Sequence, residues 1–230
     1  VAFINLDEKY LEQLAAGVQW KIFYKKGSTP TSQRLPFEIQ LLTEKPFISV
    51  AFATEQNTPI IVESNLIGYF NFNNIMTAIV VGIYFKVPAQ KIKKAIENYV
   101  PANNRSQLIR IGTNTFLLDA YNANPSSMKK ALLSFSKITA PNKIAILGAM
   151  KELGKYAPNE HSEIVELANH FDFQKIILVG EEYQGMGQQV FKDTGELKDW
   201  FEKQDFQNTY FLLKGSRSVG LEKLLPTGRV

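Results

Sequence analysis

The first third of the chain alternates short apolar runs with polar turns, which is the pattern of β-strands. A strand at residues 1–4 opens the chain, and the segment 7–17 that follows it has the spacing of a helix. Further strands are predicted at residues 20–25, 37–42, 47–53 and 59–64, with a turn-rich segment over residues 27–33. We therefore expect a β-rich beginning that contains one strand-turn-helix unit.

At Gly68 the pattern changes from strands to helices. A buried helix is predicted because nearly every position is apolar around a helical repeat of Ile75, Ala78, Ile79, Gly82 and Ile83. Pro88 begins a second helix, whose predicted apolar face holds Ile92, Ala95, Ile96 and Tyr99. Pro101 ends that helix and opens the segment PANNRSQ, the best candidate for a linker. The sequence therefore predicts two domains, residues 1–100 and 101–230.

Beyond this linker, strands alternate with helices. Strands are predicted within residues 110–119 (two of them), 143–150, 175–180 and 209–215. Helices are predicted at residues 127–138, 161–171, 187–192, 197–203 and 218–225. This alternation is typical of an α/β fold with a mostly parallel sheet covered on both faces. In such sheets ligands bind at the carboxyl ends of the strands.

Composition narrows the classes of protein that remain. Of 230 residues, 45% are hydrophobic, which is enough for a sizeable core. The net charge of +4 comes from lysines scattered along the chain, so a solvated surface is favoured over a nucleic-acid interface. The absence of cysteine excludes disulfides and thiol nucleophiles. With no apolar run of membrane-spanning length, we expect a cytoplasmic protein without membrane insertion.

Four polar loops follow predicted strands of the second domain. They are DAYNANP (119–125), GAMKELG (148–154), GEEYQGMG (180–187) and KGSRS (214–218). The carboxyl ends of parallel strands meet at one edge of a sheet, so we expect these loops to lie together. This edge is the predicted site.

Some residues of these loops have purely structural explanations. Asn124 is expected to cap a helix and Pro125 to occupy its first turn, but a cap does not explain Asp119, Tyr121 and Asn122 together. In KGSRS, two cations flank a glycine at a helix start. That arrangement fits either an anion site or an ordinary helix entry with surface charges.

Other polar residues carry weaker signals. The asparagines at residues 71–74 precede a helix and are expected to cap it, while Arg105 in the linker reads locally as a surface charge. His161 opens a helix, where it could cap the helix or contact a ligand, but its spacing from His170 argues against a shared metal site. The sequence contains no Walker A motif and no nucleophile elbow. From local patterns alone, the chain has a ligand-binding edge without catalytic machinery.

Several segments together resemble the Mur ligases that add D-alanyl-D-alanine. They are FINLDE, GYFNFNNIMTA, NNRSQ, DAYNANPSSM, LGAMKELG with the later His161, and LLKGSRSVGLE, in the family's order along the whole chain. The resemblance implies that residues 1–100 are the second part of the central ATP-binding domain and residues 101–230 the Rossmann-like C-terminal domain. The P-loop and the magnesium-binding residues would lie upstream. The chain, which opens directly on a strand, would then be a fragment inactive alone.

The resemblance also implies a reaction. ATP, with Mg²⁺, would phosphorylate the carboxylate of UDP-MurNAc-tripeptide, and the amine of D-Ala-D-Ala would attack the resulting acyl phosphate. Such an enzyme must neutralise phosphate charge and exclude water. It would act as a monomer. The sequence does not decide whether the third residue of the peptide substrate is lysine or diaminopimelate.

Residue roles follow from the same resemblance. Asn74, with Asn71 beside it, would contact the adenine, and Asp119 the ribose. Arg105 would reach the ATP phosphates, and with Lys214 is assigned to catalysis. Contacts to the substrates would come from Asn122, Asn124, Ser216 and Arg217, with Lys214 able to join the last two in holding a substrate carboxylate. No metal ligand is assigned within this chain.

Two positions depart from the family's pattern. Phe70 stands where the family has histidine, and Ala149 where it has aspartate, whose role would be lost or moved to Glu152. Two alternatives remain open. The chain could be a non-catalytic module that binds a nucleotide or peptide, or belong to a related ligase such as a folylpolyglutamate synthetase. The YNANP loop argues against the second, because that loop should differ with the incoming substrate.

Overall fold

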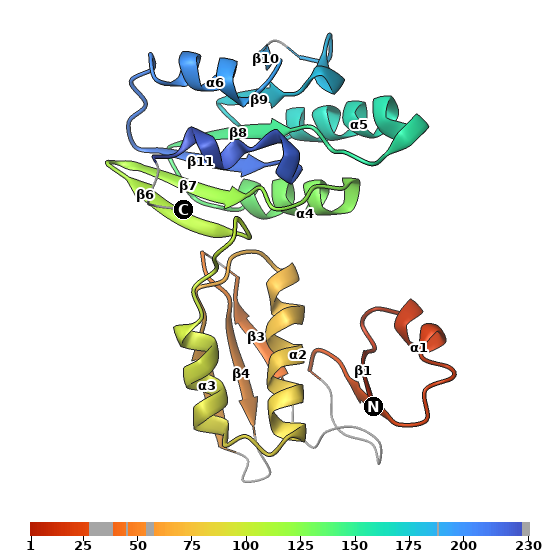
Figure 1. The fold of residues 1–230 in the computed structure, drawn as a ribbon. Coiled ribbons are helices and arrows are strands. Elements are labelled where there is room, and N and C mark those ends of the chain that lie inside the picture. Colours follow the sequence, from red (N-terminus) through yellow and green to blue (C-terminus); the bar gives the residue numbers. More distant parts are fainter. Residues whose placement is uncertain (28–38, 45, 54–57, 188, 227–230) are drawn as a thin grey trace. The chain divides into compact units, whose positions relative to one another are not determined.

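The chain divides into two compact units, Val1–Val100 and Pro101–Val230. The computed structural model describes residues 1–27, 39–44, 46–53, 58–187 and 189–226 (Figure 1). The predicted turn segment 27–33 therefore lies outside the described residues, apart from Gly27. The units meet in sequence at Pro101, where the last helix of the first unit has ended.

The first unit contains two small sheets and two main helices. Strands β1 (Ala2–Asn5) and β2 (Lys21–Tyr24) pair in parallel, joined through a short helix α1 (Tyr10–Leu14). An antiparallel sheet is formed by β3 (Ile39–Thr43), β4 (Ser49–Ala53) and β5 (Pro59–Glu63). The helices are α2 (Phe70–Tyr84) and α3 (Ala89–Asn98). Every strand expected here is found, while α1 is shorter than the predicted helix over residues 7–17.

The core of the first unit lies between the antiparallel sheet and the two helices. Its members are Ile48, Val50, Phe52 and Val62 from the sheet region, Phe72, Ile75, Met76, Ile79 and Val80 from α2, and Ile92 and Ile96 from α3. The prediction that α2 is buried is confirmed along this stripe. Ala78, Ala95 and Tyr99, expected on the apolar faces, are instead exposed, so each helix buries a narrower stripe than its composition suggested.

The second unit is built on a six-stranded sheet with the order β10-β9-β8-β11-β7-β6. The strands are β6 (Gln107–Ile111), β7 (Asn114–Asp119), β8 (Asn142–Gly148), β9 (Lys175–Val179), β10 (Val190–Phe191) and β11 (Thr209–Lys214). All neighbours are parallel except the hairpin of β6 with β7. The prediction of a mostly parallel sheet is confirmed.

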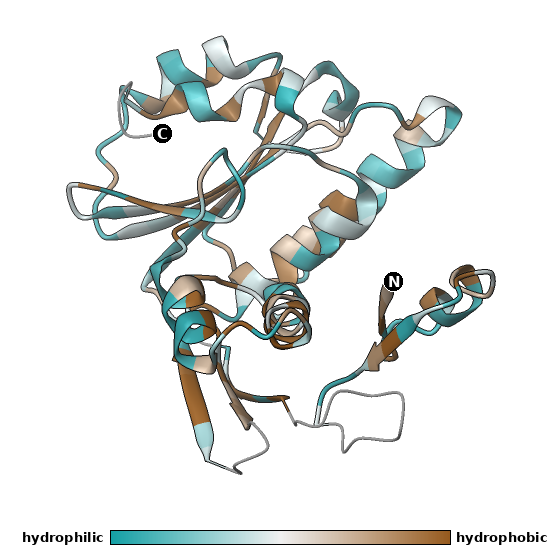
Figure 2. Ribbon diagram, turned by 60° about the horizontal axis from the view of Figure 1, so that its bottom comes forward, coloured by the Kyte–Doolittle hydropathy of each residue, from teal (hydrophilic) through white to brown (hydrophobic). Residues whose placement is uncertain are grey.

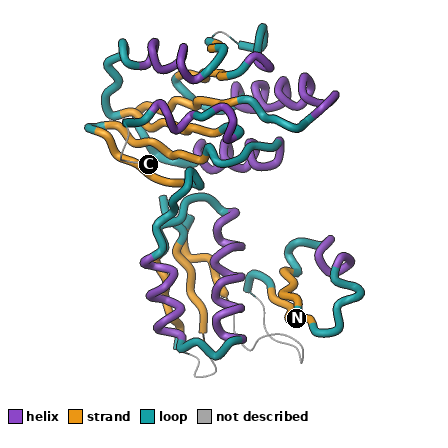
Figure 3. The backbone as a smooth tube through the Cα atoms, viewed as in Figure 1, coloured by secondary structure: helices purple, strands orange, loops and turns teal. Residues whose placement is uncertain are grey.

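Helices cover both faces of this sheet. On one side α4 (Pro125–Ser136) contacts α5 (Ala157–Asn169), and on the other α6 (Thr194–Phe201) contacts the 3₁₀ turn η4 (Leu221–Leu224) (Figure 3). Alternate side chains of β8 point to opposite faces of the sheet. Ile144 and Ile146 belong to the same core cluster as Leu197 of α6. Ala145 and Leu147 therefore face the other side. The strands are accordingly hydrophobic along most of their length (Figure 2).

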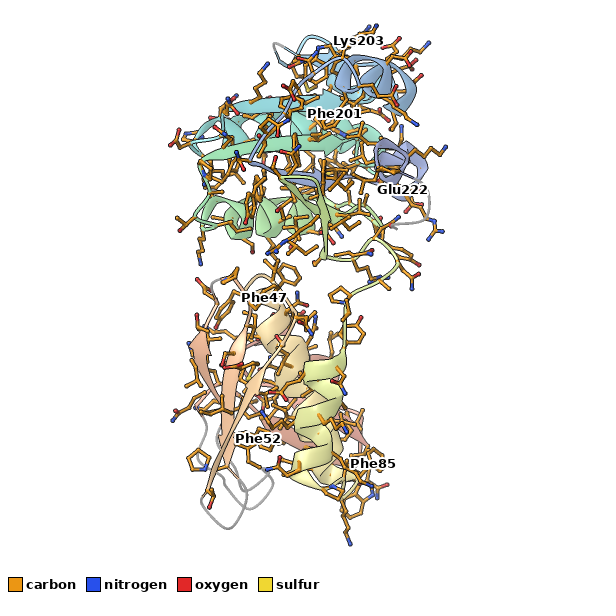
Figure 4. All side chains as sticks on the ribbon, turned by 90° about the vertical axis from the view of Figure 1, so that its left-hand side faces the viewer. Phe47, Phe52, Phe85, Phe201, Lys203 and Glu222 are labelled. Carbon is orange, nitrogen blue, oxygen red and sulfur yellow. The ribbon has the colours of Figure 1, made fainter. Side chains whose placement is uncertain are left out.

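The two units have separate cores. Phe52 belongs to the first, and Phe201 packs against the second, where it contacts Phe116 and Phe211 (Figure 4). Aromatic side chains bury large apolar areas, so clusters of this kind contribute strongly to the stability of each unit.

Two predicted helices of the second unit are wrong. The segment 187–192 holds the strand β10, because the main chain of Gln189 and Phe191 accepts hydrogen bonds from β9 and the residue after it, at 3.0 and 2.9 Å. Pairing to a sheet edge outweighs the weak helical pattern of so short a segment. The segment 218–225 forms two 3₁₀ turns, η3 (Arg217–Val219) and η4, separated by Gly220 at a left-handed φ of 71°. A helix cannot continue through that conformation.

Candidate functional site

Four loops come together at one edge of the C-terminal sheet. They follow β9, β8, β11 and β7, which are adjacent and mutually parallel, so their carboxyl ends share one edge (Figure 1). The expected convergence of the loops is therefore confirmed.

Small residues allow the main chains of these loops to pack closely. A Cβ atom added to Gly215 would lie 2.8 Å from the Cα atom of Gly148, which is too close for any side chain. A Cβ added to Gly180, whose φ is 132°, would lie 2.7 Å from the Cβ of Ala149. The ends of β8, β9 and β11 thus pack closely because glycine stands at positions 148, 180 and 215.

Lys214 braces the loop that follows β7. Its side chain is 3% exposed, and its ammonium lies 3.2 Å from the Asp119 carboxylate and 3.2 Å from the Asp119 carbonyl oxygen. It also donates a hydrogen bond to the carbonyl oxygen of Asn122. These acceptors occupy the ammonium, so in this structure Lys214 fixes the β7–α4 loop. Its predicted catalytic role stays a prediction.

Asp119 also anchors the segment that opens the second unit. Its Oδ1 atom accepts a hydrogen bond from the main-chain N–H of Ser106 at 3.0 Å. The N–H of Tyr121 in turn donates to the carbonyl oxygen of Asn104 at 3.1 Å. Arg105 is therefore held from both sides against the β7–α4 loop.

Tyr121 brings two arginines to the same place. The guanidinium carbon of Arg105 lies 3.9 Å from the centre of the Tyr121 ring, and that of Arg217 lies 5.3 Å from it. Both arginines are exposed. Among the described residues neither has an ion-pair partner, so the edge presents two free positive charges on one aromatic ring.

Ser216 and His161 connect the loops after β8 and β11. The Ser216 hydroxyl accepts a hydrogen bond from the N–H of Lys151 at 3.0 Å, and Ser216 N–H donates to the Ala149 carbonyl at 3.2 Å. His161 is fully buried, and its Nε2 accepts from the N–H of Met150 at 2.9 Å. Its Nδ1 must then carry the proton and donate to the Ala157 carbonyl. His161 thus supports the loop after β8 and does not cap α5, which begins four residues earlier.

An ion pair between Lys151 and Glu182 links the loops after β8 and β9. Burial raises the pKa of the Glu182 carboxyl, but the hydrogen bond and charge of Lys151 outweigh it and hold the pKa below its usual value. Its second oxygen, Oε2, is buried and has no partner among the described residues. Burial also raises the pKa of the neighbouring Tyr183, whose ring packs edge-on against His161.

The two loop asparagines differ in how they are engaged. Asn124 caps α4, since its Oδ1 accepts from the N–H of Ser127 at 2.8 Å while the Ser127 hydroxyl accepts from the N–H of Asn124. The predicted cap and the predicted Pro125 in the first turn are both confirmed. Asn122 is exposed, and its Oδ1 accepts only from the adjacent Ala123 N–H in the described part of the chain. Its side-chain NH2 group makes no hydrogen bond within the described residues and is available to a ligand.

The predicted adenine contacts lie in the first unit. Asn71 does not cap α2, because its amide donates to the Ile67 carbonyl at 2.7 Å and the capping position is Tyr69, which makes no side-chain cap bond. Asn74 donates to the Asn71 Oδ1 at 2.9 Å and is exposed. The cap prediction for this cluster is therefore wrong, and the two asparagines form a hydrogen-bonded pair.

Sequence reasoning missed two features of this edge. It noticed Tyr121 as unexplained but did not connect it with Arg105 and Arg217, and it passed over the Lys151–Glu182 pair. Both features join residues far apart in sequence. Their only sequence signal was that each residue lies in a loop at the carboxyl end of a strand, or, for Arg105, in the linker.

The described residues contain no group of three or more histidine, aspartate or glutamate side chains placed to hold a metal ion. Nor does any helix in the described ranges combine the length and apolar character needed to cross a membrane. The chemistry that the edge offers is recognition of negative charge by arginine, beside an engaged carboxylate and an exposed amide.

Comparison with known proteins gives the edge a context. Residues 104–209 match the family profile of the Mur ligase, glutamate ligase domain. The UDP-N-acetylmuramoyl-tripeptide–D-alanyl-D-alanine ligase of Treponema pallidum is 33% identical over 170 residues, covering 69% of this chain and 37% of that protein.

Solved structures share the fold. A crystal structure of MurF from Acinetobacter baumannii superposes with a TM-score of 0.78 at 22% identity, covering 96% of this chain and 50% of that one. MurF ligase from Thermotoga maritima, in complex with ADP, gives a TM-score of 0.76 at 16% identity, with 96% and 51% covered.

The chain thus spans about half the length of these solved proteins and 37% of its Treponema relative. The matched profile begins at Asn104 and takes in the β7, β8 and β9 loops of the edge, while the structural likeness extends over both units. Profile, sequence relative and fold agree, and residues 104–209 belong to the glutamate ligase domain of the Mur ligase family.

Proposed function

We propose that this chain is part of an ATP-dependent ligase that joins D-Ala-D-Ala to UDP-MurNAc-tripeptide, in the cytoplasm and as a monomer. The observation that carries the proposal is that Arg105 and Arg217, which have no ion-pair partner in the described part of the chain, both lie on Tyr121 at the carboxyl edge of the sheet. A reaction through an acyl phosphate requires such concentrated positive charge. The identity with the Treponema ligase supports the choice of substrates.

In this proposal residues 1–100 form the second part of the ATP-binding domain and residues 101–230 the ligase domain. Asn74 and Asn71 contact the adenine, Asp119 the ribose, and Arg105 the phosphates. The ADP bound to the Thermotoga relative supports the nucleotide assignment.

The exposed amide of Asn122 and the guanidinium of Arg217 contact the incoming dipeptide. Ser216, with its hydroxyl oxygen occupied by Lys151, can still donate its own proton to a substrate. Asn124, as a cap, acts chiefly by fixing the loop. Lys214 acts by holding that loop in place, since its ammonium is buried on protein acceptors.

Two cofactors fit the described residues to different degrees. Free guanidinium groups suit ATP, which supplies the phosphoryl group that activates the tripeptide carboxylate. Mg²⁺ has no ligand cluster within the described residues, so no step is assigned to it here. What this chain supplies is charge neutralisation and the placement of the two reactants.

A substrate panel separates the proposal from its alternatives. The full gene product that carries these 230 residues is incubated with ATP and either UDP-MurNAc-tripeptide or a folate as the acceptor. Phosphate release is then measured with D-Ala-D-Ala, with L-glutamate or with no amine. We expect release only with D-Ala-D-Ala.

Each alternative has its own outcome. Release with L-glutamate on a folate acceptor would replace the proposal with a folylpolyglutamate synthetase. Binding of ATP or dipeptide without any turnover would indicate a non-catalytic module.

A further inference from the structure

We propose that Tyr121 is a positioning residue that joins Arg105 and Arg217 into one clamp for a single phosphoryl group. The inference rests on the proposed function and revises one assignment within it, because it places Arg217 on the same anion as Arg105 instead of on the carboxylate of the dipeptide. The observation behind it is that one ring lies within 3.9 Å of one guanidinium and 5.3 Å of the other. Their separation cannot exceed the sum of these two distances.

The main chain that carries the Tyr121 ring is anchored. The N–H of Tyr121 donates to the Asn104 carbonyl at 3.1 Å, and the preceding strand ends at Asp119, which Lys214 holds at 3.2 Å. The Tyr121 ring therefore starts from an anchored main chain at the sheet edge, and its face attracts the cations that lie over it.

Arg105 is held in an unusual stretch of main chain. Asn103, Asn104 and Ser106 all have left-handed φ angles, of 57°, 58° and 48°. Such conformations are costly for residues other than glycine and persist where the surroundings enforce them. Here the enforcing contacts are the bonds from Tyr121 N–H to Asn104 and from Ser106 N–H to Asp119, one on each side of Arg105.

Arg217 is anchored from its own side. Ser216, the residue before it, donates to the Ala149 carbonyl and accepts from Lys151 N–H, which ties the β11 loop to the end of β8. Arg217 therefore starts from a fixed main chain and rests its guanidinium on a ring that comes from another loop. The bonds of Ser216 to the β8 loop and the contact of Arg217 with Tyr121 both join loops that are far apart in the sequence.

Two guanidinium groups so placed repel each other. Among the described residues no carboxylate pairs with either, and the nearby Asp119 is already satisfied by Lys214 and Ser106. An oxyanion with more than one negative charge relieves this repulsion better than a singly charged carboxylate does. Planar guanidinium forks also match phosphoryl oxygens in pairs. A phosphoryl group is thus the favoured occupant.

The test uses inorganic pyrophosphate as the probe and the whole 230-residue chain, titrated calorimetrically. Tyr121→Phe keeps the ring, and its affinity for pyrophosphate should lie within about twofold of that of the wild type. Tyr121→Leu removes the ring and should weaken binding about five- to tenfold, the range expected for loss of cation–π support. Phe173→Leu is the matched control, because Phe173 also lies under a cation, Lys143, but at the opposite end of β8. It should leave binding unchanged.

A double-mutant cycle completes the test. Arg217→Gln should weaken pyrophosphate binding in the wild type and add little in the Tyr121→Leu background, since the clamp is then already broken. Equal binding by Tyr121→Leu and wild type would overturn the proposal. So would fully additive effects of the two substitutions.

The same outcomes separate this inference from the proposed function. The titration needs no turnover, so a coupled clamp in a protein without ligase activity would keep the inference and reject the reaction. Ligase activity without coupling between Tyr121 and Arg217 would support the proposed reaction and reject the inference of a clamp. Thermal midpoints of all variants, compared with the wild type, show that a loss of binding is not a loss of fold.

Discussion

At the scale of single residues, the edge of the C-terminal sheet separates residues that hold the site from residues that face a ligand. Lys214 and Ser216 are nearly buried and bonded to protein atoms, whereas Arg105, Arg217 and Asn122 are exposed. The family resemblance read from the sequence assigns all five to the functional site. The structure divides them, because a buried ammonium with three protein acceptors has little left for a substrate.

Lys214 offers a direct test of this division. Lys214→Met leaves the Asp119 carboxylate, only 20% exposed, without its ammonium, and should destabilise the second unit by about 3 kcal/mol. Urea unfolding followed by Trp200 fluorescence, in a Trp20→Phe background, reports on that unit. Adding Asp119→Asn should recover part of the loss, because the uncompensated charge is then gone. If Lys214→Met left the stability of the second unit unchanged, Lys214 would not be holding the β7–α4 loop in place.

Contacts within the site could be predicted from the sequence only where the residues lie close together along the chain. Asp119, Asn122 and Asn124 lie in one short loop after an apolar strand, so their clustering could be predicted. The contact of Tyr121 with Arg217 joins loops after two different strands. It follows from the order of strands in the sheet, which the sequence alone does not specify.

At the scale of elements, long buried strands and amphipathic helices were predictable because each carries its own hydrophobic pattern. The helix predicted at residues 127–138 forms as α4, and its buried residues Met128, Ala131, Leu132 and Phe135 recur at helical spacing. The elements that were predicted wrongly are short. β10 has two residues and owes its existence to pairing with β9, and Gly220 interrupts what reads as a single final helix.

The capping of α4 gives a prediction at this scale. Asn124→Ala removes the acceptor for the Ser127 N–H and should cost about 1 kcal/mol of stability in the second unit. Asn124→Ser or Asn124→Asp should restore most of it, because both side chains can cap. Asn122→Ala is the matched control and should leave the denaturant midpoint unchanged. An equal loss for both asparagines would show that the cap is not the source of the effect.

At the scale of the whole molecule, the chain consists of two units with separate cores, divided between Val100 and Pro101, just after the last helix of the first unit. The two units hold different parts of the proposed machinery, with the asparagine pair in the first and the arginine clamp in the second. Neither contains a Walker A motif. We therefore expect the 230 residues alone to bind anions without hydrolysing ATP.

The central claim is amide ligation through an acyl phosphate, and isotope transfer tests it most directly. UDP-MurNAc-tripeptide labelled with ¹⁸O in its terminal carboxylate is incubated with ATP, D-Ala-D-Ala and the full gene product that carries this chain. Mass spectrometry then follows both products. The account predicts a pentapeptide product and one ¹⁸O atom in the released phosphate, because the carboxylate oxygen leaves with the phosphoryl group. Unlabelled phosphate, or no D-Ala-D-Ala adduct, would contradict it.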